Sequence, residues 1–138
     1  MLSPDISAEA VVRVQFYDLD PMEVVWHGNY FRFFEQARCA LLDKLGYNYK
    51  EMRESGFAWP IVDARLKFIR PLVFGQTVRV SAILQEYENR LKIGYEIWDQ
   101  KGMVRHTRGY TIQVAVDLAT GEMCYQTPRA LVDRVLAC

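Results

Sequence analysis

The chain has 138 residues, a formal net charge of zero and 25% charged residues, which fits one globular domain. The charge balance excludes the basic footprint of a typical nucleic-acid-binding protein. No apolar run approaches the roughly 18 residues of a membrane span, and the start, MLSPDISAEA, lacks the basic and apolar regions of a signal peptide. We therefore expect a single domain over residues 1–138, located in the cytoplasm.

The first third of the chain predicts a strand, a loop and a long helix. Apolar and polar residues alternate over residues 10–17, as in a half-buried strand, and residues 18–28 contain a proline and a glycine typical of a loop. Asn29 is a candidate N-cap for a helix that runs to about Leu45 and ends at Gly46. Helical spacing places five apolar residues on one side of this helix: Tyr30, Phe34, Ala37, Leu41 and Leu45.

The remainder predicts a sheet. A short helix from Asn48 to Ser55, capped by Asn48 and stopped by Gly56, is followed by four strand-like segments, over residues 58–69, 76–87, 90–99 and 103–116. A short edge segment over residues 123–126 precedes a terminal helix that Thr127 and Pro128 open, with Pro128 at its first position. Short hairpin links predict an antiparallel meander for the later strands. One sheet wrapped around one helix, an α+β fold, is the simplest arrangement.

Cysteine and histidine usage argues against disulfides and metals. Cys39, Cys124 and Cys138 are odd in number and match neither a disulfide framework nor a zinc-binding spacing. His27 and His106 form no H-x-H or H-x-x-x-H pair. We expect free thiols and no metal site.

The aromatic content, 13%, is high and indicates a ring-rich core or subunit interface. Four aromatic residues on the predicted strands favour an apolar outer sheet face that meets another subunit: Trp59, Tyr95, Trp98 and Tyr110.

The segment FYDLDPMEVVWHGNY, residues 16–30, carries the candidate chemistry. It places Asp20 a few residues before a His27-Gly28-Asn29 turn and the start of the long helix. A carboxylate that faces a helix N-terminus can act on an activated carbonyl, while N–H groups receive the developing oxyanion. Two structural alternatives remain open: an Asp before proline commonly initiates a turn, and a histidine can simply bond to the backbone. Asp18 is expected to cap the loop.

The pattern D-x-D-P-x-x-V-V-W-H-G-N-Y followed by F-F-E-x-A-R resembles the hotdog-fold acyl-CoA thioesterases. The nearest branch is the 4-hydroxybenzoyl-CoA thioesterase group, which includes the Tol–Pal-associated thioesterases. The resemblance covers residues 16–38 specifically. It implies a long helix wrapped by a five-stranded antiparallel sheet. It also implies homodimers that join their sheets edge to edge, often as homotetramers, with the active site at the dimer interface.

The resemblance also implies residue roles. Asp20 would be the catalytic carboxylate, either as nucleophile or as general base for a water, and His27 matches a catalytic histidine of one branch. Backbone N–H groups near His27 and Gly28 would bind the thioester oxygen, and Asn29 would cap the supporting helix. No cofactor is expected beyond coenzyme A as part of the substrate.

Two departures from the family pattern are visible. Part of the family has a catalytic tyrosine four residues before the Asp, where this chain has Phe16, and Tyr17 would point to the other face of a strand. Many members have an Ala-Gly pair where this chain has Met22 and Glu23.

Charged residues elsewhere give weaker candidates. Glu35 is a rival catalyst, since other hotdog thioesterases use a helical carboxylate, although it is more simply paired with Arg38 or Arg32. Coenzyme A phosphates need cations. Candidates for substrate binding are Arg65, Lys67 and Arg70, with further basic groups at Arg90 and Lys92 and at Arg105 and Arg108. Exposed basic residues on strands otherwise serve solubility.

The leading hypothesis is therefore hydrolysis of an acyl thioester, carried on coenzyme A or acyl carrier protein. Two alternatives remain: a hotdog dehydratase that acts on 3-hydroxyacyl thioesters, and a non-catalytic acyl-thioester binding or assembly module. Fold alone decides none of these.

Overall fold

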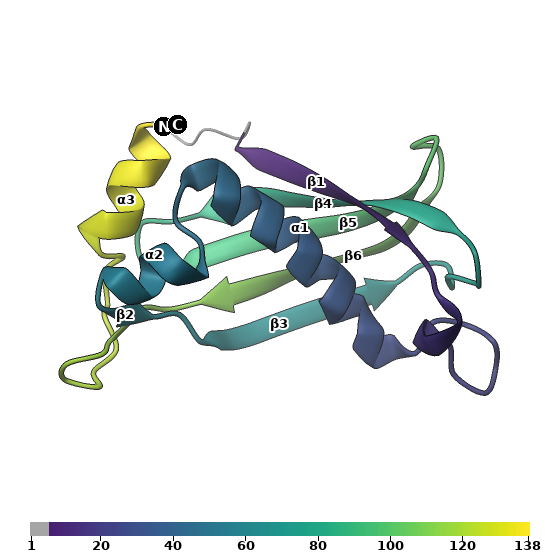
Figure 1. The fold of residues 1–138 in the computed structure, drawn as a ribbon, viewed down its shortest axis with the longest axis horizontal. Coiled ribbons are helices and arrows are strands. Elements are labelled where there is room, and N and C mark those ends of the chain that lie inside the picture. Colours follow the sequence, from purple (N-terminus) through teal and green to yellow (C-terminus); the bar gives the residue numbers. More distant parts are fainter. Residues whose placement is uncertain (1–5) are drawn as a thin grey trace.

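A computed structural model describes residues 6–138. The expectation that the first ten residues form no signal peptide therefore falls partly outside the described residues. A five-stranded antiparallel sheet curves around helix α1 (Tyr30–Leu45), as Figure 1 shows. In sheet order its strands are β1 (Ser7–Arg13), β4 (Thr77–Glu86), β5 (Leu91–Asp99), β6 (Arg105–Gln113) and β3 (Ile61–Phe68). The smaller elements are α2 (Tyr49–Glu54), the strand pair β2 (Phe57–Ala58) and β7 (Val116–Asp117), and α3 (Arg129–Leu136). The predicted α+β architecture is confirmed.

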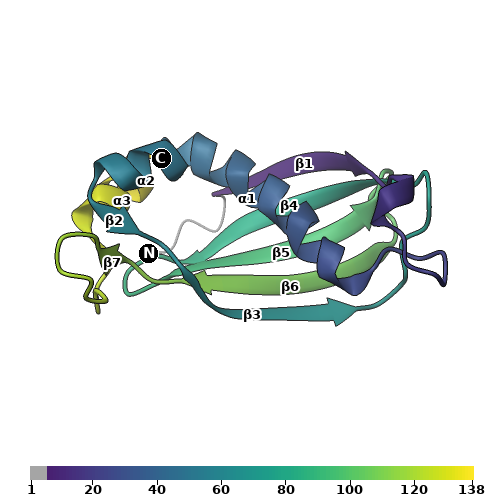
Figure 2. The same ribbon diagram turned by 60° about the horizontal axis from the view of Figure 1, so that its bottom comes forward.

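The position of β3 differs from a simple meander. Strands β4, β5 and β6 pair in sequence, but β3 lies beside β6 at the far edge of the sheet and not beside β4 (Figure 2). The link over residues 69–76 is too long for a tight hairpin, and its Val73 bridges to Val24 of the Asp20 loop. The link that follows β3 therefore lies against the loop that carries the sequence motif.

The first strand ends earlier than its alternation predicts. It covers Ser7–Arg13, and residues 16–18 form a 3-10 turn. The Gln15 N–H donates to Asp18 Oδ2 at 2.8 Å, and the Asp18 side chain is buried. This bond turns the chain away from the sheet, and it confirms the loop-capping role expected for Asp18.

Two of the predicted helix-terminal residues, Gly46 and Asn48, are confirmed. Gly46, which ends α1, has a φ of 69°, a left-handed conformation that glycine adopts without a Cβ clash. In α2, Asn48 Oδ1 accepts the Tyr49 N–H at 2.7 Å, and Glu51 Oε1 accepts the Asn48 N–H at 2.9 Å. Side-chain acceptors therefore fix the start of α2.

Four predicted segments have different limits in the structure. Pro60 lacks an N–H for a strand ladder, and the predicted strand over residues 58–69 is divided there into β2 and β3. The segment over residues 103–116 is similarly divided into β6 and β7, while residues 123–126 contribute only one bridge, between Met123 and Val116. Pro128 lies one residue before α3 instead of at its first position.

The core lies between α1 and the inner face of the sheet. The five apolar residues predicted for one side of α1 are all at most 4% exposed. Trp59 and Tyr95 are also core residues, at 8% and 2% exposed. This corrects the prediction that they face another subunit. Only Trp98 and Tyr110 lie on the outer face, where both are half-buried.

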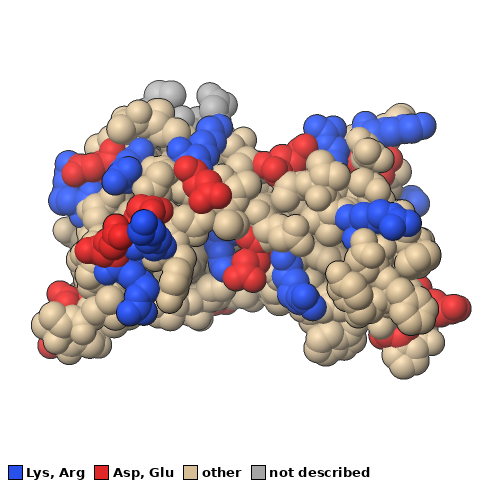
Figure 3. Space-filling model, viewed as in Figure 1, with Lys and Arg blue, Asp and Glu red and all other residues tan. Residues whose placement is uncertain are grey.

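Strand β3 is an unpaired edge. Among residues 6–138 it hydrogen-bonds only to β6, on one side, and seven of its eight residues are exposed. Ile61, Val62 and Phe68 are 46–57% exposed there. A long edge strand with apolar side chains is a site at which another strand can pair. By contrast, the face seen in Figure 3 carries interspersed acidic and basic residues with no large single-sign area. None of the helices in residues 6–138 has the length and apolar character needed to cross a bilayer.

Candidate active site

Asp20 lies in a tight loop that its own carboxylate stabilises. The Asp20 N–H donates to the Val24 carbonyl at 2.9 Å, and the Met22 N–H donates to Asp20 Oδ1 at 2.8 Å. Oδ1 thus has the turn-forming role that an Asp-Pro pair favours. Oδ2 has no hydrogen-bond partner among residues 6–138. The side chain is half-buried. The two roles that the sequence left open are compatible, because each uses a different oxygen.

The departure from the family's Ala-Gly pair has a conformational consequence. Glu23, which stands where those members have glycine, is the one non-glycine residue with a positive φ (65°) in the described part of the chain. A side chain in this region costs about 1–2 kcal/mol through contact of Cβ with the backbone.

We expect Glu23→Gly to stabilise the protein by about 0.5–1 kcal/mol. The relieved strain exceeds the extra entropy that glycine brings to the unfolded chain, about 0.5–1 kcal/mol. Urea unfolding measures the change. Met22→Gly is the matched control, because Met22 has no positive φ and should lose stability. Equal destabilisation by both variants would contradict the strain at Glu23.

The His27-Gly28 turn presents backbone donors. Residues 27–29 form a 3-10 turn directly before α1, so the N–H groups of His27 and Gly28 have no acceptor inside that turn. A Cβ at Gly28 would lie 2.3 Å from the Trp26 ring. Glycine therefore lets the indole cover this turn. The His27 side chain is exposed, and its ring centroid lies 5.0 Å from that of Trp26.

Asn29 supports the site by a different bond from the one predicted. It occupies the position before α1, but its side chain caps no helix N–H. Its Nδ2 instead donates to the Asp18 carbonyl at 2.9 Å, and the Trp26 N–H donates to the same oxygen at 2.9 Å. Asn29 thus occupies the predicted N-cap position of α1, but its side chain bonds to the Asp18 carbonyl of the preceding loop instead of to a helix N–H. The bond ties the D-x-D loop to the start of α1.

These elements enclose a hollow of about 260 Å³, called here the Asp20 hollow. Asp20, His27, Tyr30, Phe68 and Arg70 line it together. The Asp20 loop, the His27 turn, the first residue of α1 and the end of β3 therefore meet at one place.

Tyr30 is a lining residue whose role the sequence did not reveal. The pattern placed it only in the apolar face of the helix, although it directly follows His-Gly-Asn. It is 2% exposed, and its ring centroid lies 5.0 Å from that of Phe68. Burial raises the pKa of the Tyr30 phenol above its ordinary value, and the negative charge of Asp20 acts in the same direction. Tyr30 thus stays neutral beside Asp20.

The basic candidates separate into two places. Arg70 lines the Asp20 hollow. Arg65 and Lys67 point to the outer face of the sheet, around a second hollow of about 770 Å³. There the structure brings together residues that the sequence treated as separate groups: Arg65, Lys67, Lys92, Arg105 and Arg108. One of them, Arg105, is paired with Glu96 at 2.8 Å.

The other candidates lie outside the Asp20 hollow. Glu35 pairs with Arg38 at 3.2 Å, and its side chain is 67% exposed, which confirms the local ion pair. Phe16 and Tyr17 are 79% and 74% exposed and do not line the hollow. Within one chain, Tyr17 therefore does not contribute its hydroxyl to the Asp20 hollow. Over residues 6–138, no cluster of three or more His, Cys, Asp or Glu residues could hold a metal ion.

Comparison with known proteins adds family information to this geometry. A family model described as the thioesterase-like superfamily matches residues 14–134. A putative acyl-CoA thioesterase of Bacillus subtilis is 32% identical over 66% of this chain and 67% of its own length. A 1,4-dihydroxy-2-naphthoyl-CoA hydrolase of Thermosynechococcus vestitus is 30% identical over 83% of this chain and 73% of its own length.

Solved structures agree. A DHNA-CoA thioesterase from Staphylococcus aureus superposes with a TM-score of 0.78 at 27% identity, over 86% of this chain and 80% of that one. A mutant 4-hydroxybenzoyl-CoA thioesterase with its ligand superposes with a TM-score of 0.80 at 18% identity, over 94% of this chain and 98% of that one, and so supports the hotdog fold.

Proposed function

Because this chain belongs to the thioesterase-like superfamily and is a thioester hydrolase, we propose that Asp20 is its catalytic carboxylate. We also propose that residues 1–138 form a single hotdog domain. One observation carries the catalytic proposal: Asp20 Oδ2, which has no hydrogen-bond partner in the described part of the chain, lies in the same hollow as the His27 turn and the start of α1. A thioester carbonyl seated there would have a nucleophile or base on one side and N–H donors on the other.

In the proposed reaction, Asp20 either attacks the carbonyl carbon to form a mixed anhydride, which water then cleaves, or removes a proton from an attacking water. The N–H groups of His27 and Gly28, with the positive end of α1 behind them, stabilise the oxyanion. The C–S bond breaks, a C–O bond to the water oxygen remains, and a proton neutralises the departing thiolate. The products are a free acid and a thiol.

We propose that a second copy of the chain completes the site. The exposed β3 edge ends at Phe68, which lines the Asp20 hollow. Antiparallel pairing of two β3 edges would satisfy the free backbone groups and cover the apolar residues of the edge. The hollow would then lie beside the dimer interface. A homodimer, or a homotetramer built from it, is the expected assembly.

Basic residues would hold the phosphates of the carrier. Arg70 is our first candidate, because it lines the same hollow as Asp20. Arg65 and Lys67 remain predicted contacts, and from the outer face they would meet only a carrier that extends past the β3 edge. The carrier of the acyl group can be coenzyme A or acyl carrier protein, and both alternatives remain open. The predictions that no cofactor is needed and that the enzyme is cytoplasmic also remain.

The direct test is thiol release from a panel of aliphatic and aromatic acyl-CoAs, followed by the matching acyl carrier proteins. We expect the protein to release thiol from at least one of these carriers. Its mass in solution, measured by light scattering, should be two or four times that of the 16.1 kDa chain. An enoyl product without thiol would favour a dehydratase. Full activity in a monomer would contradict the shared site.

A further inference from the structure

Two further spaces follow the Asp20 hollow along the seam between α1 and β3. The first, of about 350 Å³, is called here the Phe34 hollow, and Phe31, Phe34 and Ala64 line it. The second, of about 510 Å³, is called here the Met52 cavity. It lies further along α1, where this helix meets α2 and β2.

The three spaces occur in the same order along both elements of the seam. On the helix, Tyr30 belongs to the Asp20 hollow, Phe34 to the next space and Leu42 to the Met52 cavity. On the sheet side, Phe68 is followed by Ala64 and then, beyond the start of β3, by Ala58. The Phe34 hollow and the Met52 cavity share Glu35 and Arg38 as lining residues and are therefore neighbours.

The inner end of this path is mainly apolar. Met52 and Trp59 are 7% and 8% exposed and line the Met52 cavity with Leu42, Phe57 and Ala58. The Phe34 hollow, at about 350 Å³, and the Met52 cavity, at about 510 Å³, each lie within the range of about 300–1,000 Å³ of ligand pockets. Buried apolar walls of this kind favour an alkyl group over water.

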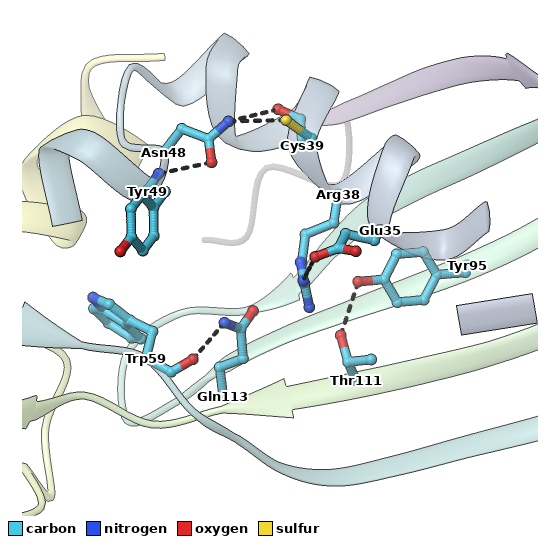
Figure 4. Close-up of polar contacts among 9 residues, drawn as sticks. All are labelled: Glu35, Arg38, Cys39, Asn48, Tyr49, Trp59, Tyr95, Thr111 and Gln113. Atoms are coloured by element: carbon cyan, nitrogen blue, oxygen red, sulfur yellow. Dashed lines mark hydrogen bonds and ion pairs between the residues drawn. The ribbon is translucent and has the colours of Figure 1, made fainter. Parts of the chain in front are cut away.

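Polar groups gather where the two spaces meet (Figure 4). The Arg38 side chain is only 16% exposed and points from α1 toward the sheet. Opposite it, Gln113 Nε2 donates to the Trp59 carbonyl at 2.7 Å, while the buried Oε1 has no partner within residues 6–138. A ligand that runs from the Phe34 hollow into the Met52 cavity passes this junction. We therefore expect binding to change abruptly between acyl chains that end before this junction and chains that pass it.

The length of the path sets the size of the ligand. From Tyr30 to Leu42, twelve helical residues at about 1.5 Å each cover roughly 18 Å. An extended alkyl chain with C–C bonds of about 1.5 Å advances roughly 1.3 Å per carbon. About nine carbons thus reach the junction near Arg38, and about fourteen reach into the Met52 cavity.

We propose that the Met52 cavity receives the distal end of a linear aliphatic acyl chain, and that the enzyme acts on acyl thioesters of about fourteen carbons. This inference rests on the proposed function at Asp20, which supplies the position of the thioester carbonyl. The chain lies along α1, passes the Arg38 junction and ends against Met52 and Trp59.

The first measurement is kcat/KM for butanoyl, octanoyl, dodecanoyl, tetradecanoyl and hexadecanoyl thioesters on the carrier that gives thiol release. Each buried methylene strengthens binding by roughly fourfold. We therefore expect tetradecanoyl to exceed octanoyl at least tenfold, with the increase concentrated after octanoyl. A flat profile, or one that peaks at or below octanoyl, would overturn the proposal.

The second measurement fills the cavity. Ala58→Phe adds a ring to its wall and should lower kcat/KM for tetradecanoyl at least tenfold, while octanoyl changes less than twofold. Ala119→Phe, in the exposed turn after β7, is the matched control and should leave both values unchanged. Leu118→Trp narrows the cavity from its exposed side and should act like Ala58→Phe if that variant does not fold.

The outcomes separate the two proposals. Equal fractional losses for octanoyl and tetradecanoyl in Ala58→Phe and Leu118→Trp would place the chain end elsewhere and overturn the inference. In that case turnover of butanoyl thioester would still support Asp20 hydrolysis. Absence of thiol release from every thioester, butanoyl included, would instead overturn the proposed function.

Discussion

Asp20→Asn should reduce kcat by about 10²–10⁴-fold, the range for loss of a positioned acid–base group, while the protein stays folded. The amide oxygen can still accept the Met22 N–H that now donates to Oδ1 at 2.8 Å, so the loop should keep its shape. The substitution removes the negative charge and with it the ability of Oδ2 to attack a carbonyl or to deprotonate water. Thiol release, measured together with the thermal unfolding midpoint, separates chemistry from folding.

His27→Ala provides the comparison for this experiment. The His27 side chain is exposed, whereas the donors proposed for the oxyanion belong to the backbone of the turn. We expect a loss of about tenfold, smaller than that of Asp20→Asn. Near-wild-type turnover in Asp20→Asn would remove Asp20 from the mechanism. A larger loss in His27→Ala than in Asp20→Asn would make His27 the central group.

The sequence predicted those parts of the fold that depend on residues close to one another in the chain. The limits of α1 and the left-handed Gly46 follow from helical spacing and from the freedom of glycine. The Asn48 cap is likewise a contact between residues close in sequence. The hotdog architecture came from the resemblance carried by residues 16–38, and the family match and the solved structures confirm it.

Long-range contacts were beyond such patterns. The Asn29 side chain bonds to the Asp18 carbonyl, eleven residues away, because the folded loop brings that oxygen within reach. The position of β3 beside β6 is set by the sheet as a whole, since no turn links them. That position brings Phe68 and Arg70 to Asp20. It also sends Arg65 and Lys67 to the other face. The side-chain composition of the Asp20 hollow therefore required the structure.

Gly109→Ala should destabilise the protein by about 2–3 kcal/mol, the upper part of the range for an overpacked core. Gly109 lies on β6, where it pairs with Leu66 of β3. A Cβ built there would be 2.3 Å from the Arg65 carbonyl oxygen and 3.0 Å from the Phe34 ring. The Phe34 ring cannot retreat easily, because it is 1% exposed and stacks on Tyr95 with centroids 4.5 Å apart. The backbone of β3 must move instead.

Movement of β3 would reach the site, because β3 supplies both Phe68 of the Asp20 hollow and the edge proposed for dimerisation. Gly109→Ala should therefore lower activity and weaken the dimer as well as the free energy of unfolding measured in urea. Gly94→Ala is the matched control on the adjacent strand. There the three atoms nearest to the added Cβ all belong to the end of the Gln85 side chain, with Nε2 at 2.3 Å, and that exposed side chain can rotate away. Equal effects of the two substitutions would show that the loss of glycine itself, rather than the contact with β3, determines the cost.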